Sequence, residues 1–383
     1  MIQELTLDNS SKRAARIAVS ALFFLTGLCF SSWASRIPAI QQSLHLSDGG
    51  LGGILLALPI GSLISMPVAG WLVSRFGSRQ VLMVTALLYA ALLPTLGLVQ
   101  ASWQLFGCLL TFGFVGSLAN ISVNTQAVAV EKMYNRSIMA SFHGLWSLAG
   151  FTGAAIGAAM GAGRVAPYQH FLLITAIAWI IVVSSIRHVV AHDSAPQERK
   201  AMFARPDGLL MILGIIAFCS MICEGAMFDW SGVYFKKVVM VPDGMSGVGY
   251  AAFMSTMAGF RFIADFLTTK LGRRRMLQFS GAFTAGGLLI AVCFPYFYSA
   301  IFGFLLVGAG VSAVVPLVYS GAGKSKKLSP GMALATVSTI GYLGFLMGPP
   351  LIGFVSEATN LMVSFSIIAV MGMCIAIMGS RVE

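Results

Sequence analysis

Charged side chains are scarce in this 383-residue chain. Only 10% of its residues are Asp, Glu, Lys or Arg, whereas soluble globular domains carry about 25%. Acidic residues are rarer than basic ones. The chain has 13 Asp and Glu against 24 Lys and Arg, which gives a formal net charge of +11. The cations are scattered between apolar runs and form no solvated basic face. This composition argues against a soluble enzyme, a disordered chain and a nucleic-acid partner.

Cysteine is also sparse and follows no ligand pattern. The six cysteines all fall within apolar runs, and none has CxxC spacing with a histidine partner. Buried free thiols behave as small apolar side chains, so we expect no disulfide, no metal site and no cofactor.

What the chain has in abundance is apolar sequence. Its hydrophobic fraction is 57% and its mean hydropathy is +0.87. A helix needs about 20 mostly apolar residues to cross a bilayer. The sequence therefore predicts an all-α membrane protein with twelve transmembrane helices, near 16–37, 48–74, 79–99, 103–130, 137–162, 168–188, 207–235, 244–270, 274–295, 298–321, 331–356 and 360–380.

The placement of the cations predicts the orientation. With both termini in the cytoplasm, 19 of the 24 Lys and Arg fall in cytoplasmic segments, as the positive-inside rule requires. The first apolar run is longer than the core of a usual signal peptide, so we expect it to be retained.

Two halves share one pattern. A polar stretch divides the chain evenly, which predicts bundles at 1–188 and 207–383 joined by a cytoplasmic linker at 189–206. Gly77, followed by Arg79, comes after the second predicted span, and Gly272, followed by Arg273, comes after the eighth. Glycine permits a tight turn between antiparallel helices. The same turn at equivalent places predicts two pseudo-symmetric six-helix bundles.

These loops resemble the signature loop of the major facilitator superfamily, Gly-x3-Asp-x2-Gly-x-Arg-x-Arg/Lys. The first loop matches at Gly70, Gly77 and Arg79, but its acidic position holds Ser74. The second loop matches better, because Asp265 precedes the basic run. The resemblance implies an intracellular gate that involves Arg79, Asp265 and Arg273.

Further motifs resemble the YbjJ-type branch, a bacterial inner-membrane group distantly similar to fucose permease. They are the Trp-Ala-Ser-Arg-Ile-Pro run from Trp33, the Val-Ala-Val-Glu run ending at Glu131, His143-Gly144, Glu224-Gly225 with Asp229-Trp230, and the Gly-Pro-rich segment 341–350. The resemblance implies a multi-pass monomer of the bacterial inner membrane, with the lipid bilayer as its surroundings. Relatives often carry an acid near position 120, where this chain has Asn120, so no carboxylate acts there.

Ionisable groups inside a membrane are costly and are candidates for function. Glu224 lies in the middle of the seventh predicted span. A buried acid that exchanges protons is what proton coupling requires, so Glu224 is our candidate coupling residue. The alternative is a structural acid bonded to a neighbouring helix.

Three other charged residues are gate candidates. Arg36, which we expect to end the first helix, is either a gate cation or a snorkelling interface residue. Asp229 is placed to pair with Arg36 or Lys236 near the outer face. Arg261 shares a helix face with Asp265 at i+4, which predicts a gate network with the basic loop.

Polar and aromatic residues supply candidates for a substrate cavity. Asn120 and Asn124 share a helix face and either bind a hydroxylated solute or hold helices together. His143, Trp146 and Ser147 form one stripe, which is either a wall for a sugar-like ligand or a helix contact. The remaining candidates are Trp33, Phe228, Tyr319 and Tyr342.

The resemblance implies a secondary transporter that moves a small organic solute by rocker-switch alternating access, with the proton as coupling ion. Scarce buried charge favours a neutral or zwitterionic solute. Proton-driven multidrug or metabolite efflux is the alternative, although the fifth span lacks the proline common in drug antiporters. No catalytic constellation indicates an enzyme, and no long loop indicates a sensor with an effector domain.

Overall fold

The computed structural model describes residues 9–134, 138–191, 208–242, 244–322 and 330–382. Every element in these ranges is a helix: α1 (Asn9–Ser43), α2 (Asp48–Leu55), α3 (Ala57–Phe76), α4 (Ser78–Leu96), α5 (Ser102–Tyr134), α6 (Met139–Ala162), α7 (Pro167–Ser185), α8 (Gly208–Lys237), α9 (Gly247–Cys293), α10 (Phe297–Val311), α11 (Val314–Ala322), α12 (Pro330–Ala358) and α13 (Leu361–Gly379). Most of the predicted linker, 192–206, lies outside the described residues.

Eleven helical segments of the described chain are long and apolar enough to cross a membrane. The sequence predicted twelve, and the difference lies in α9. Its 47 residues are interrupted at Gly272, whose φ of 79° and ψ of 157° are not helical. α10 contacts the parts of α9 on both sides of Gly272. Leu305 O accepts a hydrogen bond from Thr256 before this glycine, and Gly303 packs on Gly287 after it. In a straight helix Thr256 and Gly287 would lie about 46 Å apart, so the chain reverses at Gly272.

The turn at Gly272 has a counterpart in the first half. Gly77 separates α3 from α4 with a φ of 79° and a ψ of 150°. A positive φ is costly for residues with a Cβ but not for glycine. The paired glycine turn predicted from the sequence is therefore confirmed, with nearly the same geometry at both places.

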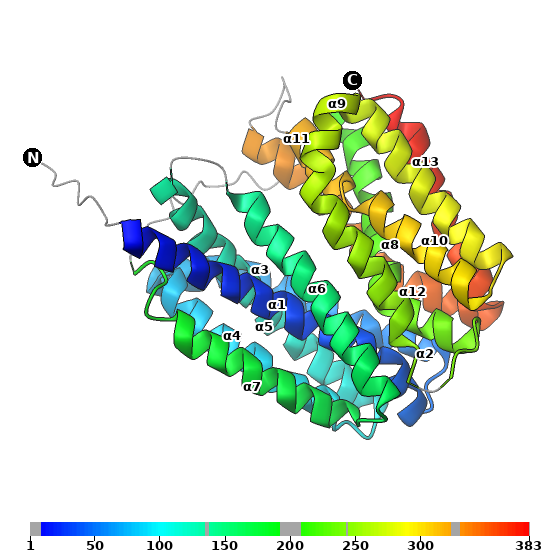
Figure 1. Cartoon of the computed structure of the whole chain (residues 1–383), viewed down its shortest axis with the longest axis horizontal. Helices are drawn as coiled ribbons and strands as arrows, with labels where there is room; N and C mark the ends of the chain where they lie inside the picture. Colours follow the sequence, from blue (N-terminus) through cyan, green and yellow to red (C-terminus); the bar gives the residue numbers. More distant parts are fainter. Residues whose placement is uncertain (1–8, 135–137, 192–207, 243, 323–329, 383) are drawn as a thin grey trace, which may run out of the picture.

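The helices pack in two groups, α1 to α7 and α8 to α13 (Figure 1). Within the first group α1 packs on α6 and α7, and α3 packs on α5; within the second, α8 packs on α12 and α13, and α9 packs on α10. Between the groups, α6 packs on α9 while α2 packs on α12. Each of these named contacts in one group has a counterpart in the other, which is a pseudo-twofold arrangement.

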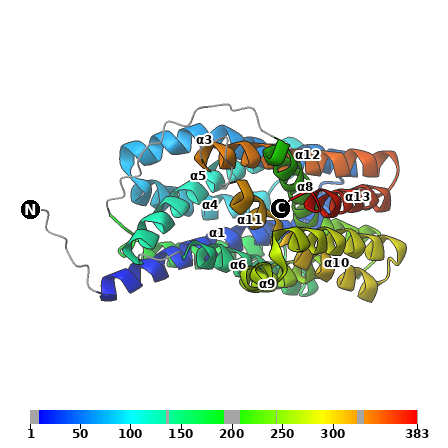
Figure 2. The same ribbon diagram turned by 90° about the horizontal axis from the view of Figure 1, so that it is seen from above.

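We call the α2/α12 and α6/α9 contacts the two seams. Antiparallel packing places the Gly77 and Gly272 turns at the same end as residues 9 and 379, which we call the terminal end. The opposite end, the far end, holds the connections from α1 to α2, α8 to α9 and α12 to α13. The groups meet at the far end and diverge toward the terminal end, as Figures 1 and 2 show.

Proline shapes several of these helices. α2 gives way to α3 at Leu56, and α10 to α11 at Ser312 and Ala313, one turn before Pro59 and Pro316 respectively. Proline has no N–H to bond the carbonyl four residues earlier. α1 does not end at Arg36, as the sequence suggested, but continues through Pro38 to Ser43. The Pro38 ring fits against Gly232 of α8, where a Cβ would lie 2.8 Å from its Cγ.

Candidate functional site

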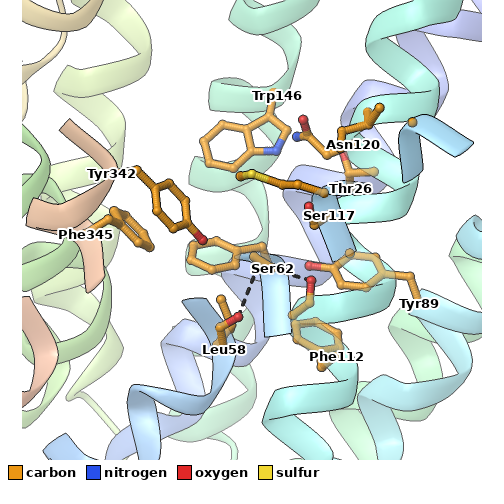
Figure 3. A pocket seen from close by; sticks show the side chains of 16 residues that line it. Thr26, Leu58, Ser62, Tyr89, Phe112, Ser117, Asn120, Trp146, Tyr342 and Phe345 are labelled. Atoms are coloured by element: carbon orange, nitrogen blue, oxygen red, sulfur yellow. Dashed lines mark hydrogen bonds between the residues drawn. The ribbon is translucent and has the colours of Figure 1, made fainter. Parts of the chain in front are cut away.

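A cavity of about 670 Å³ lies between the two groups, formed by α1, α3, α4, α5, α6 and α12. Its lining is aromatic and uncharged. The rings are Phe30, Tyr89, Phe112, Trp146, Tyr342 and Phe345, and the polar groups are Thr26, Ser62, Ser117 and Asn120. In Figure 3, Tyr342 and Phe345 face Tyr89, Phe112 and Asn120 across the cavity. Such a surface offers ring stacking and hydrogen bonds but no ionic partner.

Two hydroxyl groups fix the wall of this cavity near α3. The Tyr342 hydroxyl donates to Pro59 O at 3.1 Å, which joins α12 to α3 across the seam. The Ser62 hydroxyl lies 3.1 Å from both Leu58 O and Gly113 O, as the dashed lines in Figure 3 show. The Ser62 contact holds α3 against α5. These bonds keep the lining side chains in place without using charge.

An aromatic cluster lies against the cavity, centred on Phe228 of α8. Phe228 is buried, and its ring centroid lies 5.3 Å from that of Phe30, 6.4 Å from Trp146 and 6.3 Å from Phe345. It also contacts Phe253 of α9 at 5.8 Å. Phe228 was predicted to line the cavity; the structure places it directly behind three lining rings.

One helical turn before Phe228, Glu224 takes part in a link between the two groups. Glu224 Oε1 lies 3.5 Å from Arg261 Nη2 of α9. Arg261 Nη1 donates to the Ser147 hydroxyl of α6 at 2.7 Å. Glu224 and Ser147 are buried, and Arg261 is largely so. The acid of α8 is thus connected through one guanidinium to the other helix group.

Among the described residues, Arg261 has a partner that the sequence did not suggest, and Asp229 pairs with neither expected cation. Arg261 pairs with Glu224; the expected pair with Asp265 stays a prediction, because the Asp265 side chain lies outside the described residues. Asp229 is buried and forms no ion pair with a described residue. Arg36 is also buried rather than snorkelling, at 5% exposure, and donates to Val165 O. The sequence could not show which helices face each other.

The α2/α12 seam is closed at the far end by a polar network around Asp48. The Asp48 carboxylate accepts hydrogen bonds from Lys237 at 2.5 Å, Ser356 at 2.6 Å and Gln41 at 2.9 Å. Glu357 accepts a bond from the Gly49 N–H at 2.6 Å. Charged groups of α2, α8 and α12 therefore hold the two groups together here. None of these residues was a candidate in the sequence.

Several predicted cavity residues do not line the cavity. Asn124 donates to Asn120 O and to its Oδ1, at 2.8 and 3.0 Å. His143 packs edge-on against Phe23. Trp33 is fully buried in the core, and Tyr319 packs at the second core cluster near α8. Asn120, Trp146 and Tyr342 are the predicted residues that line the cavity.

The two predicted gate arginines of the glycine turns lie at the terminal end. Arg79 is in the first turn of α4, and Arg273 follows Gly272. Arg273 Nη2 lies 3.5 Å from the Ser320 hydroxyl of α11. The structure brings neither arginine to the cavity.

Several lining residues escaped the sequence reasoning. Tyr89, Phe112, Ser62 and Phe345 stand in apolar helices where nothing local distinguishes them from residues that face lipid. The weak signal was polarity: Ser62 and Tyr89 interrupt apolar runs, as residues buried between helices often do.

Comparison with known proteins decides the family. The model of the Major Facilitator Superfamily matches residues 19–326. The chain belongs to the major facilitator superfamily. An uncharacterized MFS-type transporter of Yersinia pestis is 32% identical over 361 residues, which cover 94% of each chain. The protein is accordingly a membrane-spanning transporter and not an enzyme.

Solved structures share the fold at low sequence identity. The nucleoside transporter NupG has a TM-score of 0.74 at 14% identity, over 96% of this chain and 98% of its own. A bacterial homologue of the human lysosomal transporter Spinster, in an inward-facing and unoccupied conformation, has a TM-score of 0.79 at 12% identity, over 98% of both chains. These likenesses concern the fold alone.

Proposed function

We propose that this protein is a proton-coupled secondary transporter that moves a small neutral or zwitterionic organic solute by rocker-switch alternating access. The observation that carries the solute class is the central cavity, with six aromatic rings, four hydroxyl or amide side chains and no charged lining residue among those described. A charged solute would lose hydration there without gaining a counter-charge. A ring that bears hydroxyl or amide groups, including a sugar-like ring, suits this lining.

Glu224 is the proposed proton carrier. Arg261 is the cation whose pairing changes when Glu224 gains or loses a proton. When Glu224 is ionised, the guanidinium is attracted to it and also bonds Ser147 across the α6/α9 seam. Protonation of Glu224 removes the negative charge and weakens that attraction. Arg261 is then free to exchange partners as the two helix groups rock. The coupling is thus a change in one ion pair at mid-depth of the seam.

The orientation follows the positive-inside rule, with both termini in the cytoplasm of a bacterium and the protein in its inner membrane. We assign two membrane crossings to α9, one on each side of Gly272, for a total of twelve. The bundles are then 1–188 and 207–383, joined by the linker 189–206, and the protein acts as a monomer. We also place it in the YbjJ-type branch, on the motifs around Trp33, His143 and Glu224.

In this orientation the far end faces outward and is closed by the Asp48 network. Opening outward requires that network and the α6/α9 contacts at the far end to separate. Asp229, Arg36, Arg79, Asp265 and Arg273 are the proposed gate residues that rearrange during the change.

A solute screen followed by flux measurement tests the proposal. Thermal unfolding of the purified protein in a panel of neutral, zwitterionic and anionic metabolites should show stabilisation by neutral or zwitterionic members, since a ligand stabilises the state that it binds. The solute is then followed into proteoliposomes with and without a pH gradient, for the wild type and Glu224→Gln. We expect gradient-driven accumulation only in the wild type, with exchange of labelled solute retained in the variant. Proton-driven accumulation by Glu224→Gln would exclude Glu224 as the essential carrier.

Efflux of apolar drugs or metabolites is the second candidate, because the aromatic lining also suits such compounds. Stabilisation by lipophilic compounds alone, with no polar metabolite active, would favour this function over solute uptake.

A further inference from the structure

A second cavity, of about 260 Å³, lies at the far end of the α6/α9 seam. It is formed by α1, the turn between α6 and α7, the end of α8 and the start of α9, so both helix groups line it. Its charged residues are Arg36, Arg164 and Lys236, and none of the described lining residues is acidic. An anion between two of these cations, Arg36 and Arg164, would relieve their mutual repulsion.

Arg36 provides the strongest indication of a ligand. Its side chain is buried, and the residue is only 5% exposed. Nη2 donates to Val165 O, and Nη1 lies 3.5 Å from Gly157 O. Nε has no hydrogen-bond partner in the described structure. Carbonyl groups bond a guanidinium but do not neutralise it, and a buried charge without a counter-charge is costly.

The backbone around this cavity is also electropositive. α7 begins at Pro167 and α9 at Gly247, and residues at both starts line the cavity. Neither helix has a side-chain hydrogen bond to its first turn from the preceding residue, Ala166 or Ser246. In α7, Pro167 has no N–H, and the N–H groups of Gln169 and His170 both bond Ala166 O. The start of α7 therefore contributes the positive end of its helix dipole, whereas the start of α9 can also offer N–H donors.

We propose that this cavity binds an oxyanion of the phosphate type, which joins the two helix groups and stabilises the closed far end. A guanidinium presents its N–H donors in a fork that matches two phosphate oxygens. The bound group would contact Arg36 and Arg164 of the first helix group and the start of α9 in the second. The phosphate belongs either to a free inorganic ion or to the headgroup of an anionic phospholipid, since in both the phosphate oxygens carry a net negative charge.

This site is separate from the central cavity, whose described lining has no charge. Its occupant is therefore a ligand of the closed conformation and not the transported solute. The inference does not depend on the identity of that solute or on proton coupling.

Thermal unfolding in detergent tests the free-ion form. Inorganic phosphate is titrated against sodium chloride at constant ionic strength, with the wild type, Arg36→Gln and Arg164→Gln. Arg164 is exposed, so its variant should fold even if Arg36→Gln does not. Arg75→Gln is the matched control, because Arg75 is exposed and lies over Trp71 near the terminal end. We expect phosphate to raise the Tm of the wild type and the control by about 2–4 °C, and to leave both cavity variants unchanged.

The same proteins in nanodiscs distinguish the lipid source. Discs of phosphatidylcholine are compared with discs that also contain phosphatidylglycerol. A rise in Tm from phosphatidylglycerol, lost in Arg164→Gln but kept in Arg75→Gln, assigns the site to a headgroup. A rise from free phosphate alone assigns it to the soluble ion. If neither source stabilises the wild type, or if the cavity variants respond as the control does, the proposal is wrong.

Discussion

The two seams are built on the same backbone plan but carry different chemistry. At the far end of the α2/α12 seam, a Cβ on Gly52 would lie 2.9 Å from Gly353 Cα. At the equivalent place in the α6/α9 seam, a Cβ on Gly161 would lie 2.7 Å from Gly244 O. Each seam therefore closes through a pair of glycines that brings two backbones into contact.

The charges on the two seams are arranged differently. The α2/α12 seam pairs an acid with a cation at its far end, through Asp48 and Lys237, and has a neutral bond at mid-depth, from Tyr342 to Pro59 O. The α6/α9 seam is crossed at mid-depth by the hydrogen bond from Arg261 to Ser147. Arg261 also pairs with Glu224 of its own helix group, and cations lie at the far end of this seam.

The two seams of this duplicated fold therefore carry different kinds of interaction. In the proposed rocker-switch movement, the symmetric backbone packing makes both seams open and close together. The link from Glu224 through Arg261 to Ser147 lies at one seam alone, and the direct charged latch between Asp48 and Lys237 is on the other. In the proposed mechanism, a change of protonation at Glu224 therefore alters the balance of a movement that both seams share.

The largest expected effect comes from removing the cation of the mid-depth pair. Arg261→Gln leaves Glu224 without its charge partner, and breaking a buried pair costs about 3–5 kcal/mol. We expect a large fall in thermal stability, measured as Tm in detergent. The double variant Glu224→Gln/Arg261→Gln removes both charges and should recover most of the loss. A double variant no more stable than Arg261→Gln would show that the ion pair does not stabilise this seam.

The glycine pairs come next. Gly353→Leu and Gly161→Leu each force a side chain into a backbone contact, and overpacking of this kind costs about 2 kcal/mol. We expect both variants to open at the far end to a similar degree, since one rigid movement separates both seams. The measurement is spin-label distance across the far end. Gly53→Ala is the control, because a Cβ on Gly53 would meet no atom within 4 Å. Opening in only one variant would contradict the shared movement.

The charged latch of the α2/α12 seam should matter less. Asp48→Asn keeps the shape but removes the charge that Lys237, Ser356 and Gln41 contact, at a cost of about 1.5 kcal/mol. Lys237→Gln should cost less than about 1 kcal/mol, because its side chain is 43% exposed. The same distance measurement should show more opening in Asp48→Asn. Equal opening would assign the latch to the Lys237 pair alone.

The smallest effect belongs to the neutral bond at mid-depth. Tyr342→Phe loses one hydrogen bond to Pro59 O, worth about 1 kcal/mol. We expect a slight change in solute affinity, because the ring still lines the cavity, and no change in the dependence of uptake on the pH gradient. A variant that loses the pH dependence would place the coupling on both seams.

Much of this architecture could be predicted from the chain. The Gly77 and Gly272 turns were identifiable because a glycine repeated between apolar runs is typical of a tight turn between antiparallel helices. Asn120, Trp146 and Tyr342 were found because polar or amphipathic side chains are unusual in apolar helices. The break at Leu56 was missed, since the composition of the run does not change there and Pro59 alone does not fix where a helix is interrupted.

The charged partners were the hardest to predict. Spacing along one helix suggested Arg261 with Asp265, a local pair at i+4. Spacing could not suggest Glu224, which pairs with Arg261 but lies 37 residues away on another helix. Which residues meet across a seam depends on how each helix is rotated about its own axis. That rotation follows from side-chain packing such as Phe228 against Phe30, and no short motif records it.

The position of Trp146 gives the cavity an optical reporter of its own. Of the six tryptophans, Trp33 and Trp230 are fully buried, while Trp71, Trp103 and Trp179 lie exposed on the outer surface of the helices. Trp146 alone among them lines the central cavity. A molecule that stacks on its indole will change the emission of that one fluorophore, so occupancy can be read in the unlabelled protein by ultraviolet fluorescence.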